Sequence, residues 1–276
     1  MKYQIEKNTV QETLMLPLYA RNLCTELFPQ YFRDHNASRL MEKVAYDFGP
    51  MEARSKKTLN VFGALEVAMR QTDLAEEVKL YLKDLPRAAV VNLGCGLDNT
   101  GRECDNGQCL IYNLDLPDVI EVRNALLPAG EREENIACDL NNLKWMDRID
   151  ARHGVIFFAA GVFYYFKTEQ VKIILKSAAE RFKGGRMVFD ACGPLGVKMM
   201  LKTWIKQAGI KDVGAYLSVR DAQELSCEKP VIKVSSRGYM RGYCRLGKDV
   251  KGLYRLLSYI GDEWIGMKIV RLDFGV

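Results

Sequence analysis

Two glycines and one carboxylate stand where apolar runs of this chain end, an arrangement that suits the binding of a nucleoside. The apolar run 88–93 ends in Gly94 and Gly96, and a second run, 110–114, ends in Asp115. A strand, a glycine turn and a second strand that ends in a carboxylate form the nucleoside site of open α/β sheets. The glycines let the backbone approach a ligand closely, and the carboxylate can accept hydrogen bonds from two ribose hydroxyls.

Two further strand ends carry small or polar residues. Asp139 and Leu140 follow a short apolar run, and Ala160 and Gly161 follow the apolar run 154–159. In a doubly wound sheet, ligands bind beyond the carboxyl ends of the strands. We therefore expect these residues to line one nucleoside pocket together with the glycine turn.

The residues of the glycine turn decide which cofactor it favours. A dinucleotide site needs a third glycine so that the pyrophosphate meets a helix N-terminus. Asn99 stands at that position, and Asp98 adds a carboxylate that would repel phosphate. S-adenosylmethionine has no phosphate, and Asp139 can accept a hydrogen bond from its adenine amino group. The pattern favours S-adenosylmethionine, and the alternatives are an NAD-dependent oxidoreductase and a nucleoside-binding protein without catalysis.

These motifs resemble those of the leucine carboxyl methyltransferase family, which includes bacterial polyketide O-methyltransferases of the tetracenomycin type. The similar stretches are the glycine loop, the strand end at Asp115 with an arginine that follows it, a helix ahead of the first strand, and an N-terminal run. They lie at 93–100, 114–117 with Arg123, 70–73 and 18–37. The resemblance covers most of the chain.

The resemblance implies one α/β domain over residues 1–276, with the seven-stranded, Rossmann-like sheet of class I methyltransferases and an N-terminal helical cap. The cap spans 1–85 and the catalytic core spans 86–276. The sequence patterns agree with this division. Apolar residues recur at helical spacing before Pro86, and short apolar runs alternate with amphipathic segments after it.

The resemblance also implies roles for the residues at the strand ends. Gly94 and Gly96 would lie under the methionine part of S-adenosylmethionine, and Asp115 would hold its ribose. Asp139 and Leu140 would frame the adenine.

Three more residues belong to the implied cofactor site. Arg70 is the first candidate for binding the cofactor's carboxylate and Arg21 is the second, the alternative for both being an arginine on a helix surface. Ala160 is the third, and with Gly161 it stands near the fourth strand end, where protein-methylating members of the family carry a glutamate. That difference brings the chain closer to the small-molecule branch.

The acceptor side of the site is less defined by the sequence. Methyl transfer is an in-line displacement, so the enzyme has to align the acceptor oxygen and exclude water. A carboxylate acceptor needs no general base, whereas a hydroxyl does. Tyr164 and Tyr165 follow the fourth strand, where they would shape the acceptor pocket, contact the sulfonium or form aromatic core. Neither His35 nor His153 is placed as a base, so the sequence predicts no catalytic residue.

The chain beyond the fifth strand gives weaker patterns. Residues 195–208 are expected to be helical, 216–219 to form a short sixth strand, and 266–272 to form the last strand. The segment 222–262 has no assigned structure. It holds three arginines four residues apart: Arg237, Arg241 and Arg245. They predict a solvated basic face or, alternatively, a site for an anionic acceptor.

Bulk properties limit the possible partners. The 40 basic and 35 acidic residues give a net charge of +5, which is too small to indicate nucleic acid. No apolar run reaches the roughly 18 residues of a membrane-spanning helix, and the first residues lack a signal-peptide core. We therefore expect a cytoplasmic protein that acts on a small molecule and not at a membrane.

Eight cysteines without a Cys-x-x-Cys pair, and two histidines, predict no metal site. The oligomeric state is left open.

Overall fold

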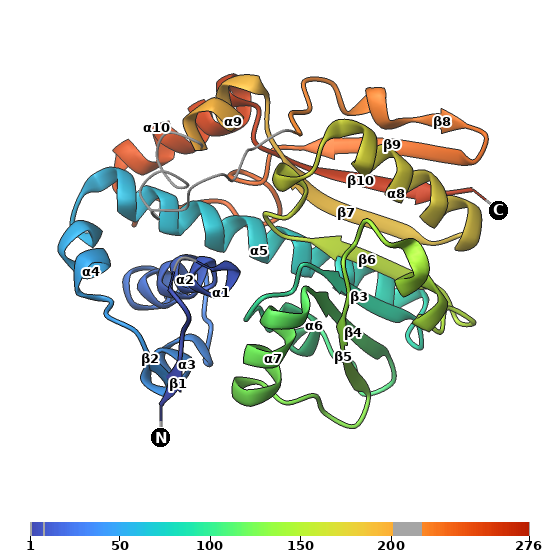
Figure 1. Ribbon diagram of the computed structural model, residues 1–276. Helices are drawn as coiled ribbons and strands as arrows, with labels where there is room; N and C mark the ends of the chain where they lie inside the picture. The colour runs from blue at the N-terminus through green and yellow to red at the C-terminus, as the bar shows by residue number, and fades with distance from the viewer. Residues whose placement is uncertain (1, 8, 201–216, 276) are drawn as a thin grey trace.

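An eight-stranded mixed sheet forms the centre of the protein (Figure 1). The computed structural model describes residues 2–7, 9–200 and 217–275. The strand order is β5-β4-β3-β6-β7-β10-β9-β8. The first five of these strands run parallel, and β10 is antiparallel to both of its neighbours. The strands are β3 (Ala89–Leu93), β4 (Leu110–Asp115), β5 (Glu133–Ala137), β6 (Val155–Ala159), β7 (Arg186–Ala191), β8 (Cys227–Glu228), β9 (Val231–Arg237) and β10 (Lys268–Phe274).

This topology confirms the predicted Rossmann-like α/β sheet, with one difference in the number of strands. The additional strand is the two-residue β8, which pairs with β9 at the edge of the sheet. The direction of the chain across the sheet reverses between β3 and β6, which are neighbours although β4 and β5 lie between them in the sequence. Such a switch point is where open α/β sheets bind their ligands.

Each central strand is buried on both faces because helices cover the sheet from both sides. On one face, the side chains of Ile156 and Phe158 pack against the long helix α5 (Thr58–Asp84). On the other face, Phe157 packs against α8 (Thr168–Arg181). Successive side chains of a strand point to opposite faces, so the apolar run of β6 serves both layers.

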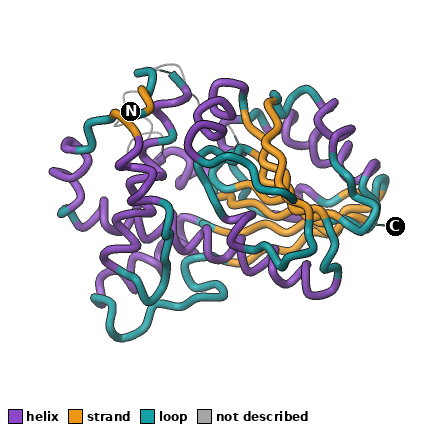
Figure 2. The backbone as a smooth tube through the Cα atoms, turned by 90° about the horizontal axis from the view of Figure 1, so that it is seen from below, coloured by secondary structure: helices purple, strands orange, loops and turns teal. Residues whose placement is uncertain are grey.

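The N-terminal region is helical, as predicted, and its last helix belongs to the core. Figure 2 shows the strands gathered towards one side with helices flanking them. The N-terminal helices are α1 (Val10–Thr13), α2 (Met15–Leu27), α3 (Ala37–Lys43), α4 (Gly49–Ser55) and α5, with a small sheet of β1 (Tyr3–Gln4) and β2 (Val44–Ala45). Because α5 packs on the sheet, the expected cap and core share one continuous apolar layer.

The remaining helices connect or follow the strands. They are α6 (Thr100–Glu103), α7 (Pro117–Leu126), α9 (Pro194–Met200) and α10 (Gly252–Ile260). The helix expected over 195–208 is confirmed as far as residue 200, and the rest of it lies outside the described residues. None of the helices in the described part of the chain is long and apolar enough to cross a membrane.

The predicted sixth strand is wrong where the structure describes it. Tyr216 lies outside the described residues, and 217–219 form no strand. Leu217 and Val219 are nonetheless buried, and the Val219 amide donates to the Cys192 carbonyl at 2.9 Å. The strand actually found is β9, inside the segment that had no assigned structure. Its sequence is mostly polar because it lies near the sheet edge, where few of its side chains are buried.

Candidate functional site

The carboxyl ends of β3, β4, β6 and β7 meet at one edge of the sheet, because these strands are parallel neighbours. The turn after β3 carries two glycines in the left-handed region, Gly94 with φ of 64° and Gly96 with φ of 46°. A Cβ atom on Gly94 would lie 2.5 Å from a methyl carbon of Val162, which follows β6. Glycine is therefore required there both by the backbone conformation and by the close approach of the neighbouring loop.

Asp115 ties the glycine turn to the end of β4. One carboxylate oxygen accepts from the Gly96 amide at 2.7 Å, and the other accepts from the Leu116 amide at 2.8 Å. Burial raises the pKa of Asp115, and these two hydrogen bonds oppose the rise. Each oxygen keeps a free lone pair, so the arrangement is compatible with the predicted ribose contact.

Asp98 points into the protein rather than towards the sheet edge. Its carboxylate accepts from the side chains of Asn92 at 3.0 Å and Gln71, and from the Thr100 amide at 3.0 Å. The acidic residue that argued against a dinucleotide is thus a structural anchor at the start of α6. That helix has only four residues, too few to provide a strong N-terminal dipole for a pyrophosphate.

Two buried arginines hold the loop that follows β3. Arg123, which is 1% exposed, donates to the carbonyls of Gly96 at 3.0 Å and Asp98 at 2.6 Å. Arg21 donates to the Leu97 carbonyl at 2.9 Å and pairs with Asp34 at 2.7 Å. The sequence marked Arg123 only as part of a motif and gave it no role. The cofactor contact of Arg21 stays a prediction, and in this structure its guanidinium binds the Leu97 carbonyl and Asp34.

The residues predicted to frame the adenine lie beyond β5. Asp139 is exposed and accepts from the Asn141 amide at 2.9 Å, while Leu140 is 5% exposed and belongs to the core. The Cys138 amide donates to the Asp115 carbonyl at 2.8 Å, so these residues follow directly beside the ribose candidate. Their arrangement agrees with the predicted order of ribose and adenine along the edge.

Arg70 reaches the same edge from α5. Its Nη1 donates to Asp190, at the end of β7, at 3.1 Å. A Cβ on Gly161 would lie 2.9 Å from that Nη1 atom, so the guanidinium of Arg70 packs against the turn after β6. The Nε atom of Arg70 is buried and has no hydrogen-bond partner among the described residues. A buried donor without a partner is costly, and a ligand carboxylate would satisfy it.

The two tyrosines after β6 have different surroundings. Tyr164 is 5% exposed, and burial raises its pKa well above the ordinary value. Tyr165 is 45% exposed. Tyr164 is in the same apolar cluster as Tyr239, so its place agrees with the aromatic-core interpretation. Half-buried Ala160 directly follows β6 and packs against the same apolar cluster.

A row of carboxylates on α5, which includes Asp73 and Glu77, holds the end of β9 and the residues that follow it. The sequence did not reveal this contact. We call residues 237–243 the C-terminal segment. Its Arg237 pairs with Asp73 at 2.7 Å and with Glu77 at 2.8 Å, and both carboxylates are almost fully buried. The Asp73 carboxylate also accepts from the Tyr243 amide at 2.8 Å. Arg237 is thus neutralised by helix α5 and does not form part of a solvated basic face.

Glu66 belongs to the same row on α5, and its Oε1 accepts a hydrogen bond from the Tyr239 hydroxyl at 3.5 Å. Burial raises the pKa of Glu66 to about 7. The one sequence signal for this residue is its spacing from Arg70, one helical turn away.

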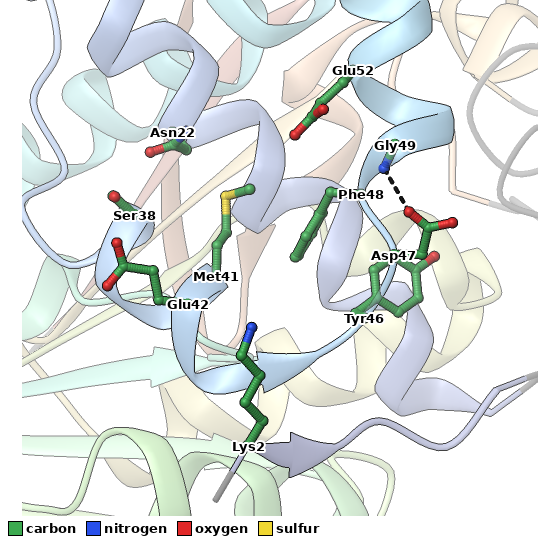
Figure 3. A pocket seen from close by; sticks show the side chains of 10 residues that line it. All are labelled: Lys2, Asn22, Ser38, Met41, Glu42, Tyr46, Asp47, Phe48, Gly49 and Glu52. Atoms are coloured by element: carbon green, nitrogen blue, oxygen red, sulfur yellow. Dashed lines mark hydrogen bonds between the residues drawn. The ribbon is translucent and has the colours of Figure 1, made fainter.

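A separate hollow lies among the N-terminal helices (Figure 3). It has a volume of about 470 Å³. Its lining residues come from the N-terminal region and not from the strand ends: Lys2, Asn22, Ser38, Met41, Glu42, Tyr46, Asp47, Phe48, Gly49 and Glu52. Among the residues that the structure describes, no group of three His, Cys, Asp or Glu side chains is arranged to hold a metal ion.

The donor set at the sheet edge fits S-adenosylmethionine. The guanidinium of Arg70, whose buried Nε has no partner among the described residues, suits its carboxylate, and a carboxylate with free lone pairs suits its ribose. The cofactor's positive charge is also compatible with an edge that carries Asp115 and Asp190.

Comparison with known proteins gives an independent result. Residues 16–179 match the family described as leucine carboxyl methyltransferase. The tetracenomycin polyketide synthesis O-methyltransferase TcmP of Streptomyces glaucescens is 27% identical over 186 residues, which are 67% of this chain and 67% of TcmP.

Solved structures show likeness of fold. A DUF574 family protein from Streptomyces avermitilis has a TM-score of 0.60 at 13% identity, covering 92% of this chain and 96% of that one. The plantazolicin methyltransferase BamL, solved with a triazolic desmethylPZN analog and SAH, has a TM-score of 0.52 at 12% identity, covering 97% and 100%.

Proposed function

The chain belongs to the leucine carboxyl methyltransferase family, and on that premise we propose that it methylates an oxygen atom of a small molecule. It is an S-adenosylmethionine-dependent methyltransferase. The proposed acceptor is a carboxylate or hydroxyl of a polyketide-like compound. The similarity to TcmP, whose name describes O-methylation in polyketide synthesis, supports this class of acceptor.

The observation that carries the proposal is the unpaired donor of Arg70. Its Nε is buried at the carboxyl edge of the sheet without a partner among the described residues. A binding carboxylate would satisfy it, and the methionine part of S-adenosylmethionine has one. Gly94 and Gly96 would lie under that part of the cofactor, and Arg21 stays the second candidate for the carboxylate.

The adenosine part would extend along the edge away from Arg70. Asp115 is proposed to accept hydrogen bonds from the ribose hydroxyls with the lone pairs that its amide partners leave free. Asp139 and Leu140, which follow β5, are proposed to frame the adenine. Ala160, on the other side of the glycine turn, would leave room near the methyl group.

The chemistry asks little of the protein beyond alignment. S-adenosylmethionine supplies a methyl group on a sulfonium, an electrophile that needs no further activation. The chain has to hold the acceptor oxygen in line and keep water out, and the buried wall that includes Tyr164 suits the second task. A carboxylate acceptor reacts as the anion. A hydroxyl acceptor has to lose a proton. Glu66, which lies one helical turn from Arg70 and accepts from the Tyr239 hydroxyl, is the proposed group to receive it, since burial raises its pKa to about 7.

Thermal unfolding in the presence of nucleosides tests the cofactor, and a turnover assay tests the acceptor class. We expect S-adenosylmethionine and S-adenosylhomocysteine to raise the Tm, and NAD to leave it unchanged. Mass spectrometry of matched pairs such as 2-naphthol and 2-naphthoate, together with hydroxylated polycyclic acids, then detects methyl esters or ethers. Stabilisation by NAD alone would contradict the cofactor. Binding of S-adenosylmethionine without methylation of any acceptor would favour a nucleoside-binding protein that has lost catalysis.

A further inference from the structure

Asp190 occupies a central place at the site edge that neither the sequence patterns nor the proposed function uses. It is the fifth residue of β7, and it is 2% exposed. One carboxylate oxygen accepts from Arg70 Nη1 at 3.1 Å. The other accepts from the Gly161 amide at 2.6 Å. A single buried carboxylate therefore joins α5, the end of β7 and the turn after β6.

Both partners of Asp190 are placed where the reacting part of the cofactor would lie. Arg70 offers its remaining buried donor, Nε, to a ligand. Gly161 has a φ of 72° and lies so close to the guanidinium that a side chain there would collide with it. The orientation of Arg70 and the conformation of the Gly161 turn are thus set by the same anion.

We propose that Asp190 is a positioning residue for methyl transfer, which fixes Arg70 to receive the amino-acid part of the cofactor and fixes the Gly161 turn beside it. This inference rests on the proposed function. Asp190 itself does not touch the cofactor. It acts by holding one edge of the guanidinium so that the other edge faces the ligand, and a planar guanidinium can be held from two sides in this way.

A carboxylate is needed in this position because both of its partners are donors. Arg70 and Gly161 bond different oxygens of Asp190, and an amide of the same size has an acceptor oxygen at only one of these two positions and a donor at the other. Asp190→Asn would therefore place an N–H group against another N–H group on one side. The guanidinium would also lose its charge partner and its fixed orientation.

Two ligands that differ only in the amino-acid part separate positioning from general damage. S-adenosylhomocysteine carries the carboxylate and ammonium, and 5′-methylthioadenosine lacks both. For Asp190→Asn we expect the Kd of S-adenosylhomocysteine to rise about tenfold, with the Kd of 5′-methylthioadenosine changing less than twofold. In the Arg70→Met background, Asp190→Asn should add no further loss. Asp273→Asn, a carboxylate of β10 paired with Arg186 at 2.7 Å, is the matched control and should leave both affinities unchanged.

Calorimetric titration of both ligands distinguishes the possible failures. If the wild-type chain binds no S-adenosylhomocysteine, the proposed function itself fails. If the wild type binds it but Asp190→Asn binds it equally well or more tightly, or loses both ligands to the same extent, the positioning role is overturned. Should Asp190→Asn not fold, Asp190→Glu takes its place. It keeps both acceptors but shifts them by one methylene, and the same selective loss is expected.

Discussion

The two sides of the proposed site are built in different ways. On the glycine-loop side, the residues after β3, β4 and β5 are placed by parallel strand pairing and by short hydrogen bonds such as that from the Gly96 amide to Asp115. On the side of the C-terminal segment, position depends on ion pairs between residues far apart in the chain. Arg237 and Asp73 are separated by 164 residues. The first arrangement follows from residues at the strand ends and from the order of the strands in the sheet. The second depends on charged side chains of a helix and a distant segment that meet only in the folded chain.

This difference predicts on which side a substitution lowers the free energy of unfolding and on which side it weakens ligand binding. A buried ion pair costs desolvation energy, and removing one partner leaves the other without compensation. The glycine turn is held by strand pairing on both sides as well as by the Asp115 carboxylate, so the loss of that one side chain should affect ligand binding more than stability. Mutations on the C-terminal side should therefore act on stability, and mutations on the glycine-loop side should act on binding.

The largest effect is expected for Asp73→Ala. The change removes the charge partner of Arg237 and the acceptor of the Tyr243 amide, beside the second buried carboxylate, Glu77. Unfolding in urea should show a loss of about 2–4 kcal/mol, since the Tyr243 amide loses its acceptor and Arg237 keeps only Glu77 as a charge partner. At a temperature where the variant is folded, its affinity for S-adenosylhomocysteine should stay within about threefold of the wild type.

A control on the same helix sharpens this prediction. Glu76 faces solvent and pairs with Lys79 at 2.9 Å, with side chains 38% and 46% exposed. Glu76→Ala should cost less than about 0.5 kcal/mol. Equal losses for the two variants would show that the buried row on α5 does not fix the C-terminal segment.

On the glycine-loop side, Asp115→Ala should weaken the binding of S-adenosylhomocysteine by roughly 1–3 kcal/mol, because charged hydrogen bonds to the ribose are lost. The unfolding free energy should fall less than for Asp73→Ala. Isothermal titration measures the affinity, and Asp139→Ala provides the comparison at an exposed position of the same edge. An unchanged affinity for Asp115→Ala would remove this residue from the ribose site.

The remaining effect concerns pH and Glu66, and it is seen only as a change with pH. Burial raises the pKa of this carboxyl from 4.5 to about 7, so the folded state holds its proton more tightly than the unfolded state. The contribution of this group to the free energy of unfolding is complete below pH 4.5 and is lost as the pH rises through 7. Glu66→Gln stays neutral. Its stability relative to the wild type should rise by about 2–3 kcal/mol between pH 5 and pH 8.

Urea unfolding at several pH values measures that difference, and Glu180→Gln on the exposed face of α8 is the control. Glu103, whose pKa burial also raises to about 7, is present in both chains and cancels in the comparison. A difference that does not change between pH 5 and pH 8 would show that Glu66 ionises as it does in water.

The sequence predicts the glycine-loop side well because its signals are short in range. An apolar run followed by Gly94 and Gly96 predicts a strand and a turn, and Asp115 after the next run predicts a carboxylate beside that turn. The parallel pairing of β3 with β4 and β6 then brings the strand ends together. The confirmed sheet follows from the same alternation of apolar runs and amphipathic helices.

The other side could not be predicted in the same way. Asp73 and Glu77 have the spacing of an exposed helix face, and only the structure shows that Arg237 covers them. Strand β9 is polar because it pairs near an edge, so its apolar signal is weak. Asp190 looks like the end of an ordinary strand until Arg70 and Gly161 are seen on either side of it. These contacts depend on the whole fold.

The most direct test of the account is a crystal structure of the chain with S-adenosylhomocysteine. We predict electron density along the carboxyl ends of β3, β4 and β6, with the ligand carboxylate within hydrogen-bond distance of Arg70 Nε and the ribose hydroxyls on Asp115. Density in the hollow among the N-terminal helices, or a ligand at the sheet edge with its carboxylate away from Arg70, would contradict the assignment of the site.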